Sequence, residues 1–232
     1  MDIDIILEPD VAPAAIAELA VAAEKLGIRA LWSSNYHQHW DAFLALAPAA
    51  AATSKILLGP LAISPWEMHP LKIANSLLSL NEISNGRAMI AISGGGGVLG
   101  AIGWRVQNEG AVWPGQHPIK KTRYPDRRVR GVRECIEILQ QASTGEFSSG
   151  YDGGTFVISR PFIMQWAKSS PPLIYSCSSG PQMIRMGARI AAGIQVSDFT
   201  VDMMSEAKEN IRLGMAKRDE PDEDFRLGNF WA

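Results

Sequence analysis

Residues 55–93, KILLGPLAISPWEMHPLKIANSLLSLNEISNGRAMIAIS, decide the fold of this chain. Lys55–Ile63 and Ala88–Ser93 are short apolar runs, which are typical of strands covered on both faces. Between them, Pro70–Ile83 carries apolar residues at helical spacing and is followed by Asn85-Gly86, a pair that ends helices. The order strand, helix, strand predicts two neighbouring parallel strands joined by an outer helix.

The same alternation continues on both sides of this unit. Further strands are predicted at Ile3–Leu7, Arg29–Ser33, Leu173–Ser176, Gly193–Val196 and Asp224–Trp231. Further helices are predicted from Pro13 to Leu26 and at Asp41–Ala52, Asp126–Ser143, Pro181–Ala191 and Asp202–Arg218. In the first of these helices, Ile16, Leu19, Ala20, Ala23 and Leu26 share one face. The pattern predicts an α/β fold, a TIM (β/α)8-type barrel.

The barrel is predicted to lack its last strand and helix, as if truncated at the C-terminus. A barrel closes by pairing its last strand with its first, and only seven such strands are found. We expect one domain over residues 1–232 with two interruptions. Residues 94–127 are rich in Gly, Pro, Lys and Arg and are expected to form an insertion or lid over the barrel mouth. Residues 146–158 are expected to form a hairpin with its turn at Asp152-Gly153-Gly154.

Composition narrows the class of function. The chain is 47% hydrophobic and 20% charged, with a net charge of −2, so we expect no nucleic-acid partner and no membrane association. No apolar run approaches the roughly 20 residues of a membrane-spanning helix. The two cysteines, Cys135 and Cys177, form no disulfide framework, which predicts a cytoplasmic protein.

Several spaced blocks carry a resemblance to a known family. They are LGPLAISP at 58–65, His69-Pro70, LNEISNGRA at 80–88, ISG at 92–94 and PPLIYSCSSGP at 171–181. The chain resembles the luciferase-like monooxygenase superfamily and its F420-dependent branch, which includes the methylenetetrahydromethanopterin reductases. The resemblance implies an oxidoreductase that uses coenzyme F420, or reduced FMN, for hydride transfer or monooxygenation of a small organic substrate. It also implies a homodimer.

Two predicted loops are candidates for cofactor binding. Ser178, Ser179 and Gly180 follow a strand and open a helix, where free N–H groups and the helix dipole favour an anion. An ordinary helix cap would look the same, and the resemblance favours a phosphate. Gly94 and Gly95 follow a buried strand, so their backbone is expected to lie close to cofactor or substrate, or to form a plain surface loop. The glycine pattern there is not a dinucleotide fingerprint, because it follows the fourth strand rather than the first.

The third strand holds further candidates that rest on the resemblance alone. It implies a cis peptide between Leu61 and Ala62 beneath the cofactor ring, with Ser64 beside it. Many relatives have Gly where this chain has Leu61, and a plain trans strand is the alternative.

The loop after the second strand supplies the catalytic candidates. F420-dependent relatives often have an Asp-His pair here, whereas this chain has Asn35 and Tyr36, and Asn35 is expected at the cofactor. His37 titrates near neutrality and could deliver a proton, Tyr36 could donate to a substrate oxygen, and Trp40 completes the set. A His packed in a loop without a catalytic role is the alternative.

Other interpretations remain open. His37 and His39 form an H-x-H pair, but the later strand ends offer no histidine, so we expect no metal. A basic run could receive a polyanionic cofactor tail or an acidic substrate, or be a solvated face; its members are Lys120, Lys121, Arg123, Arg127, Arg128 and Arg130. The alternative functions are a non-catalytic flavin-binding barrel and a metal-dependent hydrolase barrel.

Overall fold

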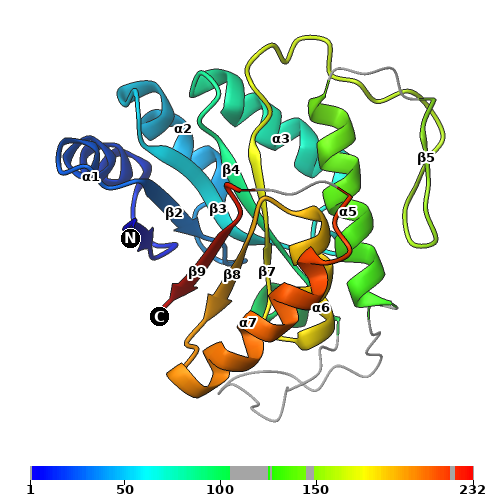
Figure 1. Ribbon diagram of the computed structural model, residues 1–232. Helices are drawn as coiled ribbons and strands as arrows, with labels where there is room; N and C mark the ends of the chain where they lie inside the picture. Colours follow the sequence, from blue (N-terminus) through cyan, green and yellow to red (C-terminus); the bar gives the residue numbers. More distant parts are fainter. Residues whose placement is uncertain (1, 105–124, 126, 145–148, 220–222, 232) are drawn as a thin grey trace.

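The computed structural model describes residues 2–104, 125, 127–144, 149–219 and 223–231. Its centre is a seven-stranded sheet in which every neighbouring pair of strands is parallel (Figure 1). In order across the sheet, the strands are β1 (Asp4–Leu7), β2 (Ala30–Ser34), β3 (Leu57–Ile63), β4 (Met89–Ser93), β7 (Leu173–Cys177), β8 (Gly193–Ser197) and β9 (Arg226–Phe230). The predicted α/β barrel-type fold is confirmed.

Helices cover the outside of this sheet (Figure 1). They are α1 (Pro13–Lys25), α2 (Ala42–Ala52), α3 (Pro70–Ile83), α5 (Arg128–Ser143), α6 (Pro181–Ile190) and α7 (Val201–Met215). Local chemistry sets where they begin. The Asp41 carboxylate accepts hydrogen bonds from the N–H groups of Phe43 and Leu44 and so caps α2, while α3 and α6 each begin with a proline.

The range 94–127 is not the continuous loop that the sequence predicted. Within it, a short helix α4 (Gly97–Ala101) buries Leu99 completely. The burial of the Leu99 side chain stabilises this short helix and outweighs the low helix propensity of its glycines. The rest of the expected lid, 105–124 and 126, and with it Lys120, Lys121 and Arg123, lies outside the described residues.

A small hairpin packs against α5. Its strands β5 (Tyr151–Asp152) and β6 (Val157–Ile158) pair antiparallel. The buried carboxylate of Glu134, on α5, accepts hydrogen bonds from three consecutive backbone N–H groups of the turn, at 2.9 Å each; these belong to Gly154, Thr155 and Phe156. These hydrogen bonds to the Glu134 carboxylate hold the hairpin turn against α5.

The inside of the sheet has its own apolar cluster. Its buried members are Ala30, Trp32, Leu61, Met89, Ala91 and Tyr175. The rings of Trp32 and Tyr175 meet edge to face with centroids 5.5 Å apart. Gly59 is needed where β3 passes β4, because a Cβ there would lie 2.1 Å from the Met89 carbonyl oxygen. At the two edges of the sheet, Arg226 of β9 forms an ion pair with Asp2, which precedes β1.

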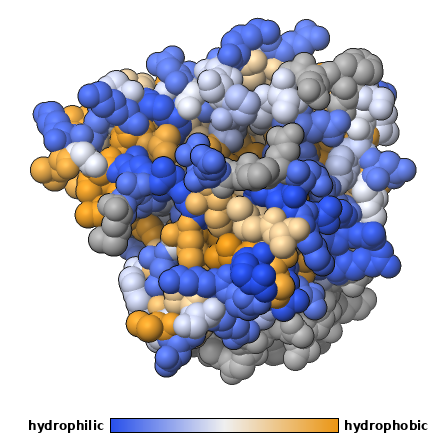
Figure 2. Space-filling view, viewed as in Figure 1, coloured by the Kyte–Doolittle hydropathy of each residue, from blue (hydrophilic) through white to orange (hydrophobic). Residues whose placement is uncertain are grey.

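One predicted helix face is only partly right. In α1, Ile16, Ala20 and Ala23 are buried, but Leu19 is 44% exposed and Leu26, just past the helix, is 81% exposed. The small alanines let α1 lie close to its neighbours, so the buried stripe is narrower than the apolar pattern implied. Figure 2 shows hydrophobic residues gathered in the middle of one face of the molecule, over β8 and β9, with polar residues around them. Among the described residues, the helices are too short or too polar to cross a bilayer.

Candidate functional site

The predicted site loops all leave the same rim of the sheet. Because the strands are parallel, the segments that follow β2, β3, β4 and β7 emerge at their carboxyl ends, the edge where barrels of this type hold their sites. The segments after β2 and β7, which hold His37 and Ser179, therefore share one rim.

A cavity of about 810 Å³ opens on this rim. It brings together two of the predicted cofactor-binding loops and three arginine or glutamine side chains. Its lining includes Ser93, Gly94, Gly95, Cys177, Ser178, Ser179, Gly180, Arg128, Gln182 and Arg185. The residues predicted after β2 and at the end of β3 are not part of this lining.

The start of α6 forms one wall of the cavity. Its N-cap, Gly180, offers no side-chain hydrogen bond to the first turn, and an added Cβ at Gly180 would meet nothing within 4 Å. The Ser178 hydroxyl oxygen accepts a hydrogen bond from the Gly180 N–H at 3.3 Å, which shapes the turn. A helix start without a side-chain cap leaves partial positive charge for an anion.

Arg128 also lines the cavity. Its Nη2 donates to the Gly95 carbonyl at 3.3 Å, while its Nε is buried and has no hydrogen-bond partner among the described residues. No carboxylate in the described part of the chain pairs with it, and burial lowers its pKa. Gly94 makes the approach possible, since a Cβ there would lie 3.0 Å from Nη2. A partly buried guanidinium without a counter-ion is unfavourable unless a ligand supplies the negative charge.

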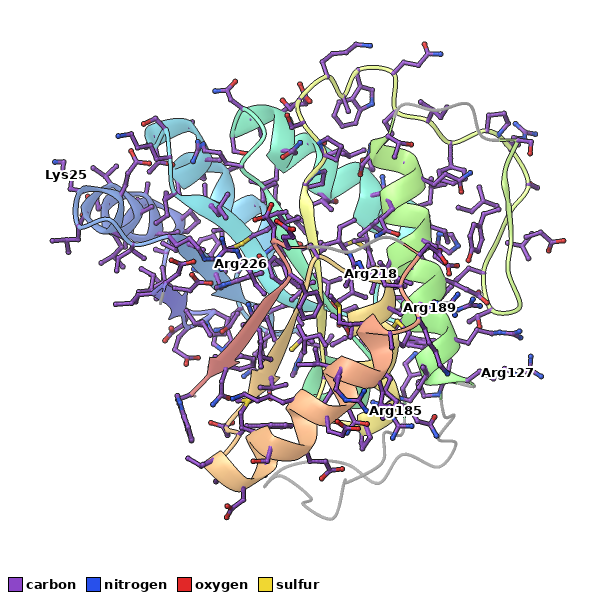
Figure 3. The ribbon with its side chains drawn as sticks, in the orientation of Figure 1. Lys25, Arg127, Arg185, Arg189, Arg218 and Arg226 are labelled. Atoms are coloured by element: carbon purple, nitrogen blue, oxygen red, sulfur yellow. The ribbon has the colours of Figure 1, made fainter. Side chains whose placement is uncertain are left out.

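The other arginines of this region differ from Arg128. A second cavity of about 540 Å³ adjoins the first through Arg128 and Gln182. Of its cations, Arg130 lies 3.6 Å from Glu134 and Arg133 lies 3.4 Å from Glu137. Arg127 directly precedes α5, and Arg185 lies in the middle of α6 (Figure 3), where its Nε donates to Asn210 at 2.6 Å. Arg128 is therefore the cation of this group whose buried Nε has no acceptor within the part of the chain that the structure describes.

The end of β3 contains the cis peptide that the resemblance implied. The peptide bond between Leu61 and Ala62 is cis. The Asn35 amide nitrogen donates to the Ala62 carbonyl at 3.3 Å and to the Glu67 carboxylate at 2.6 Å. Ser64 is fully buried, and its hydroxyl accepts from the Trp66 N–H at 3.3 Å, so it organises the loop from within.

Glu67 is a residue that the sequence analysis missed. Burial raises the pKa of its carboxyl to about 7, although the hydrogen bonds from the Asn35 side chain and the Ser64 backbone lower it. The only signal in the sequence was an acidic residue inside an otherwise apolar strand-to-helix turn. Its link to Asn35 spans 32 positions and could not be read from spacing.

The catalytic candidates after β2 lie at the surface. Tyr36 is 36% exposed, Trp40 is 51% exposed, and His37 is exposed as well. The rings of Tyr36 and His37 lie 4.8 Å apart, so these two side chains are brought together. Their roles remain predictions.

Two other kinds of site, a metal centre and a reactive cysteine, are not supported by the described residues. Within the described ranges there is no group of three or more His, Cys, Asp or Glu residues that could hold a metal ion. Cys177 lines the cavity, but burial raises the pKa of its thiol to about 12, so the thiolate is scarce at neutral pH.

The chain is similar in sequence to two archaeal reductases over most of its length. The chain is 28% identical over 195 residues to a 5,10-methylenetetrahydromethanopterin reductase of Archaeoglobus fulgidus, covering 84% of this chain and 52% of that protein. It is 30% identical over 197 residues to the Methanopyrus kandleri protein of the same name, covering 82% and 54%. The chain thus spans about half the length of the curated relatives it matches.

Solved structures agree on the fold. The F420-dependent tetrahydromethanopterin reductase of Methanopyrus kandleri matches with a TM-score of 0.78 at 24% identity, covering 99% of this chain and 65% of that one. A long-chain alkane monooxygenase matches with a TM-score of 0.77 at 14% identity, covering 99% and 63%. The family model for luciferase-like monooxygenases matches residues 3–230. This match extends over nearly the whole chain, which therefore belongs to the luciferase-like monooxygenase family.

Proposed function

We propose that this chain belongs to an oxidoreductase that binds coenzyme F420, with FMN as the alternative, and acts on a small organic substrate by hydride transfer or monooxygenation. The observation that carries the proposal is the rim cavity, which is lined both by Arg128, whose buried Nε has no partner among the described residues, and by the uncapped start of α6. The similar proteins named as F420-dependent support the choice of cofactor.

The residues present fit the phosphate of such a cofactor. A phosphate brings several charged acceptor oxygens, and the cavity offers the Ser178 and Ser179 hydroxyls, the first turn of α6 and the Arg128 guanidinium. A volume of about 810 Å³ is ample for one end of a cofactor. Gly94 and Gly95 have no side chains, so the backbone of the loop after β4 could lie directly against the bound cofactor. Gly95 also has a positive φ of 84°, a conformation that favours glycine.

The ring would lie over the end of β3, beside the cavity on the same rim. Leu61, Ala62 and Asn35 are the proposed contacts, and the Asn35 amide holds the Ala62 carbonyl in place. When bound, the cofactor supplies two-electron chemistry, and the chain supplies binding, orientation and exclusion of water. Tyr36, His37 and Trp40 are proposed to contact the substrate, because they stand exposed at this rim.

A spectral titration tests the proposal. Purified protein is titrated with F420 and, separately, with FMN, while absorbance and fluorescence are followed. A deazaflavin absorbs near the violet edge and a flavin in the blue, so the two are read independently. We expect F420 to bind well below millimolar concentration. If both cofactors bind more weakly than about 1 mM, or about −4 kcal/mol, the proposal fails.

Turnover separates an enzyme from a non-catalytic flavin-binding relative. This second candidate is favoured by Asn35, an amide where F420-dependent relatives often have an aspartate. An enzyme would oxidise or reduce the bound cofactor with some substrate, whereas a binder would change only its spectrum.

A further inference from the structure

Glu67 occupies a defined position at the rim. It lies in the turn between β3 and α3, and its N–H donates to the Ser64 carbonyl at 3.1 Å, which fixes the turn. Its side chain points back to the end of β2, where its Oε1 accepts from the Asn35 amide nitrogen at 2.6 Å. The Glu67 carboxyl group is therefore held in place by Asn35, the residue that directly follows β2.

The same amide nitrogen reaches the end of β3. Asn35 donates both to Glu67 and to the Ala62 carbonyl, so one nitrogen joins the carboxyl group to the peptide at which the cofactor ring is proposed to lie. A donor shared between two oxygen acceptors has no freedom to flip without losing both contacts. Glu67 is thus linked to the proposed ring position by two hydrogen bonds that share the Asn35 amide nitrogen.

The surroundings of Glu67 are poor in charge. Burial raises the pKa of its carboxyl to about 7, and no cation contributes to the shift. The titratable groups on the adjoining segments include His69 in the same turn and His37 in the loop after β2, and Arg128 lies on α5. Burial lowers the pKa of His69, whose Nδ1 accepts from the Leu71 N–H at 3.2 Å. His37 is exposed, and Arg128 turns to Gly95.

We propose that Glu67 is the proton-exchanging group of the site, held by Asn35 against the Ala62 carbonyl, and that filling the site changes its protonation. The proposal rests on the proposed function, since it places the cofactor ring at this carbonyl. It gives Glu67 the acid–base role that the sequence analysis assigned to His37. Glu67 acts on the ligand through position and charge, and Asn35 is its positioning residue.

The proton balance is simple. A ring laid over the end of β3 removes water from a carboxyl group that is already half-buried, which favours its neutral form further. The carboxylate then takes one proton from the protonated form of the buffer, which is left as its conjugate base, and the Asn35 N–H continues to donate to the same oxygen. At pH 7 a group with a pKa near 7 is about half ionised, so binding takes up at most about 0.5 proton per site through Glu67.

Calorimetry in two buffers measures this proton. The holoprotein is formed by titrating the chain with F420 at pH 7 in PIPES and in Tris, whose ionisation enthalpies differ, and the difference in binding enthalpy gives the number of protons exchanged. Phosphate and other groups of the ligand contribute a constant background. Glu67→Gln should lower the uptake by up to about 0.5 proton while leaving binding measurable. Glu18→Gln, at an exposed position of α1, is the matched control and should equal wild type.

A second measurement needs no cofactor. Carboxyl carbon NMR of glutamate-labelled protein should show one inflection near pH 7 that Glu67→Gln removes and Glu18→Gln keeps. An inflection for Glu67 near pH 4.5, or equal proton uptake in wild type and Glu67→Gln, overturns the inference and leaves the proposed function standing. Failure of F420 and FMN to bind overturns the proposed function and the ligand-linked role of Glu67 together.

Discussion

Replacing Arg128 by glutamine should weaken cofactor binding without unfolding the protein. The buried Nε has no partner among the described residues, so a ligand anion is its natural acceptor. A charge-assisted hydrogen bond contributes about 1.5–3 kcal/mol, which corresponds to roughly a 10- to 150-fold rise in Kd. The glutamine amide ends where the arginine Nε lies, two bonds short of Nη2, so the variant loses the hydrogen bond from Nη2 to the Gly95 carbonyl.

The stability of the same variant should hardly change. The bond from Arg128 to Gly95 is long, at 3.3 Å, and its loss costs about 0.5 kcal/mol at most. Removing a partly buried charge offsets that loss, so Tm should stay within about 2 °C of wild type. The assay pairs thermal unfolding with fluorescence titration of F420 and FMN, and Arg189→Gln, exposed on α6, is the control. Unchanged affinity in Arg128→Gln at wild-type stability would refute the reasoning.

Three further variants follow from single contacts. Gly94→Ala places a Cβ 3.0 Å from the Arg128 Nη2 and should raise the Kd for F420 several-fold with little change in Tm; equal affinity by the same titration would contradict the contact. Glu24→Gln removes a carboxylate that accepts hydrogen bonds from residues 54–56. Burial raises the pKa of this carboxyl, but the hydrogen bonds lower it further, to about 2. Its contribution to the free energy of unfolding is therefore present above pH 4.5 and is lost as the pH falls toward 2. The variant should lower Tm at pH 7 by about 2–4 °C, with the difference vanishing near pH 2. Gly59→Ala drives a Cβ to 2.1 Å from a backbone oxygen of β4 and should abolish soluble folded protein, and a normal far-UV spectrum with wild-type Tm would disprove the clash.

Elements bounded by strong local signals could be predicted from the sequence. The helix Pro70–Ile83 begins and ends where it was predicted, because proline fixes its first turn and Asn85-Gly86, both at positive φ, end it. The order of parallel strands followed from the alternation of apolar runs and amphipathic helices. The helix α4 was missed because its stability comes from burial of Leu99 and not from local propensity.

The candidate site was predictable in outline and not in detail. The loops after β4 and β7 were singled out, and they line one cavity. Arg128 was visible only as one cation in a basic run, because the burial of its Nε without an acceptor among the described residues depends on packing against Gly94 and Gly95. Glu67 was invisible because its partner lies on another strand, and the change in its pKa arises from burial, which composition and spacing do not report.

The position of the cofactor phosphate tests the central claim most directly. A crystal structure of the protein soaked with F420, or with FMN, should show the phosphate between the Arg128 guanidinium and the first turn of α6, within hydrogen-bond distance of Ser178 or Ser179. A bound cofactor whose phosphate lies away from this cavity would contradict the account.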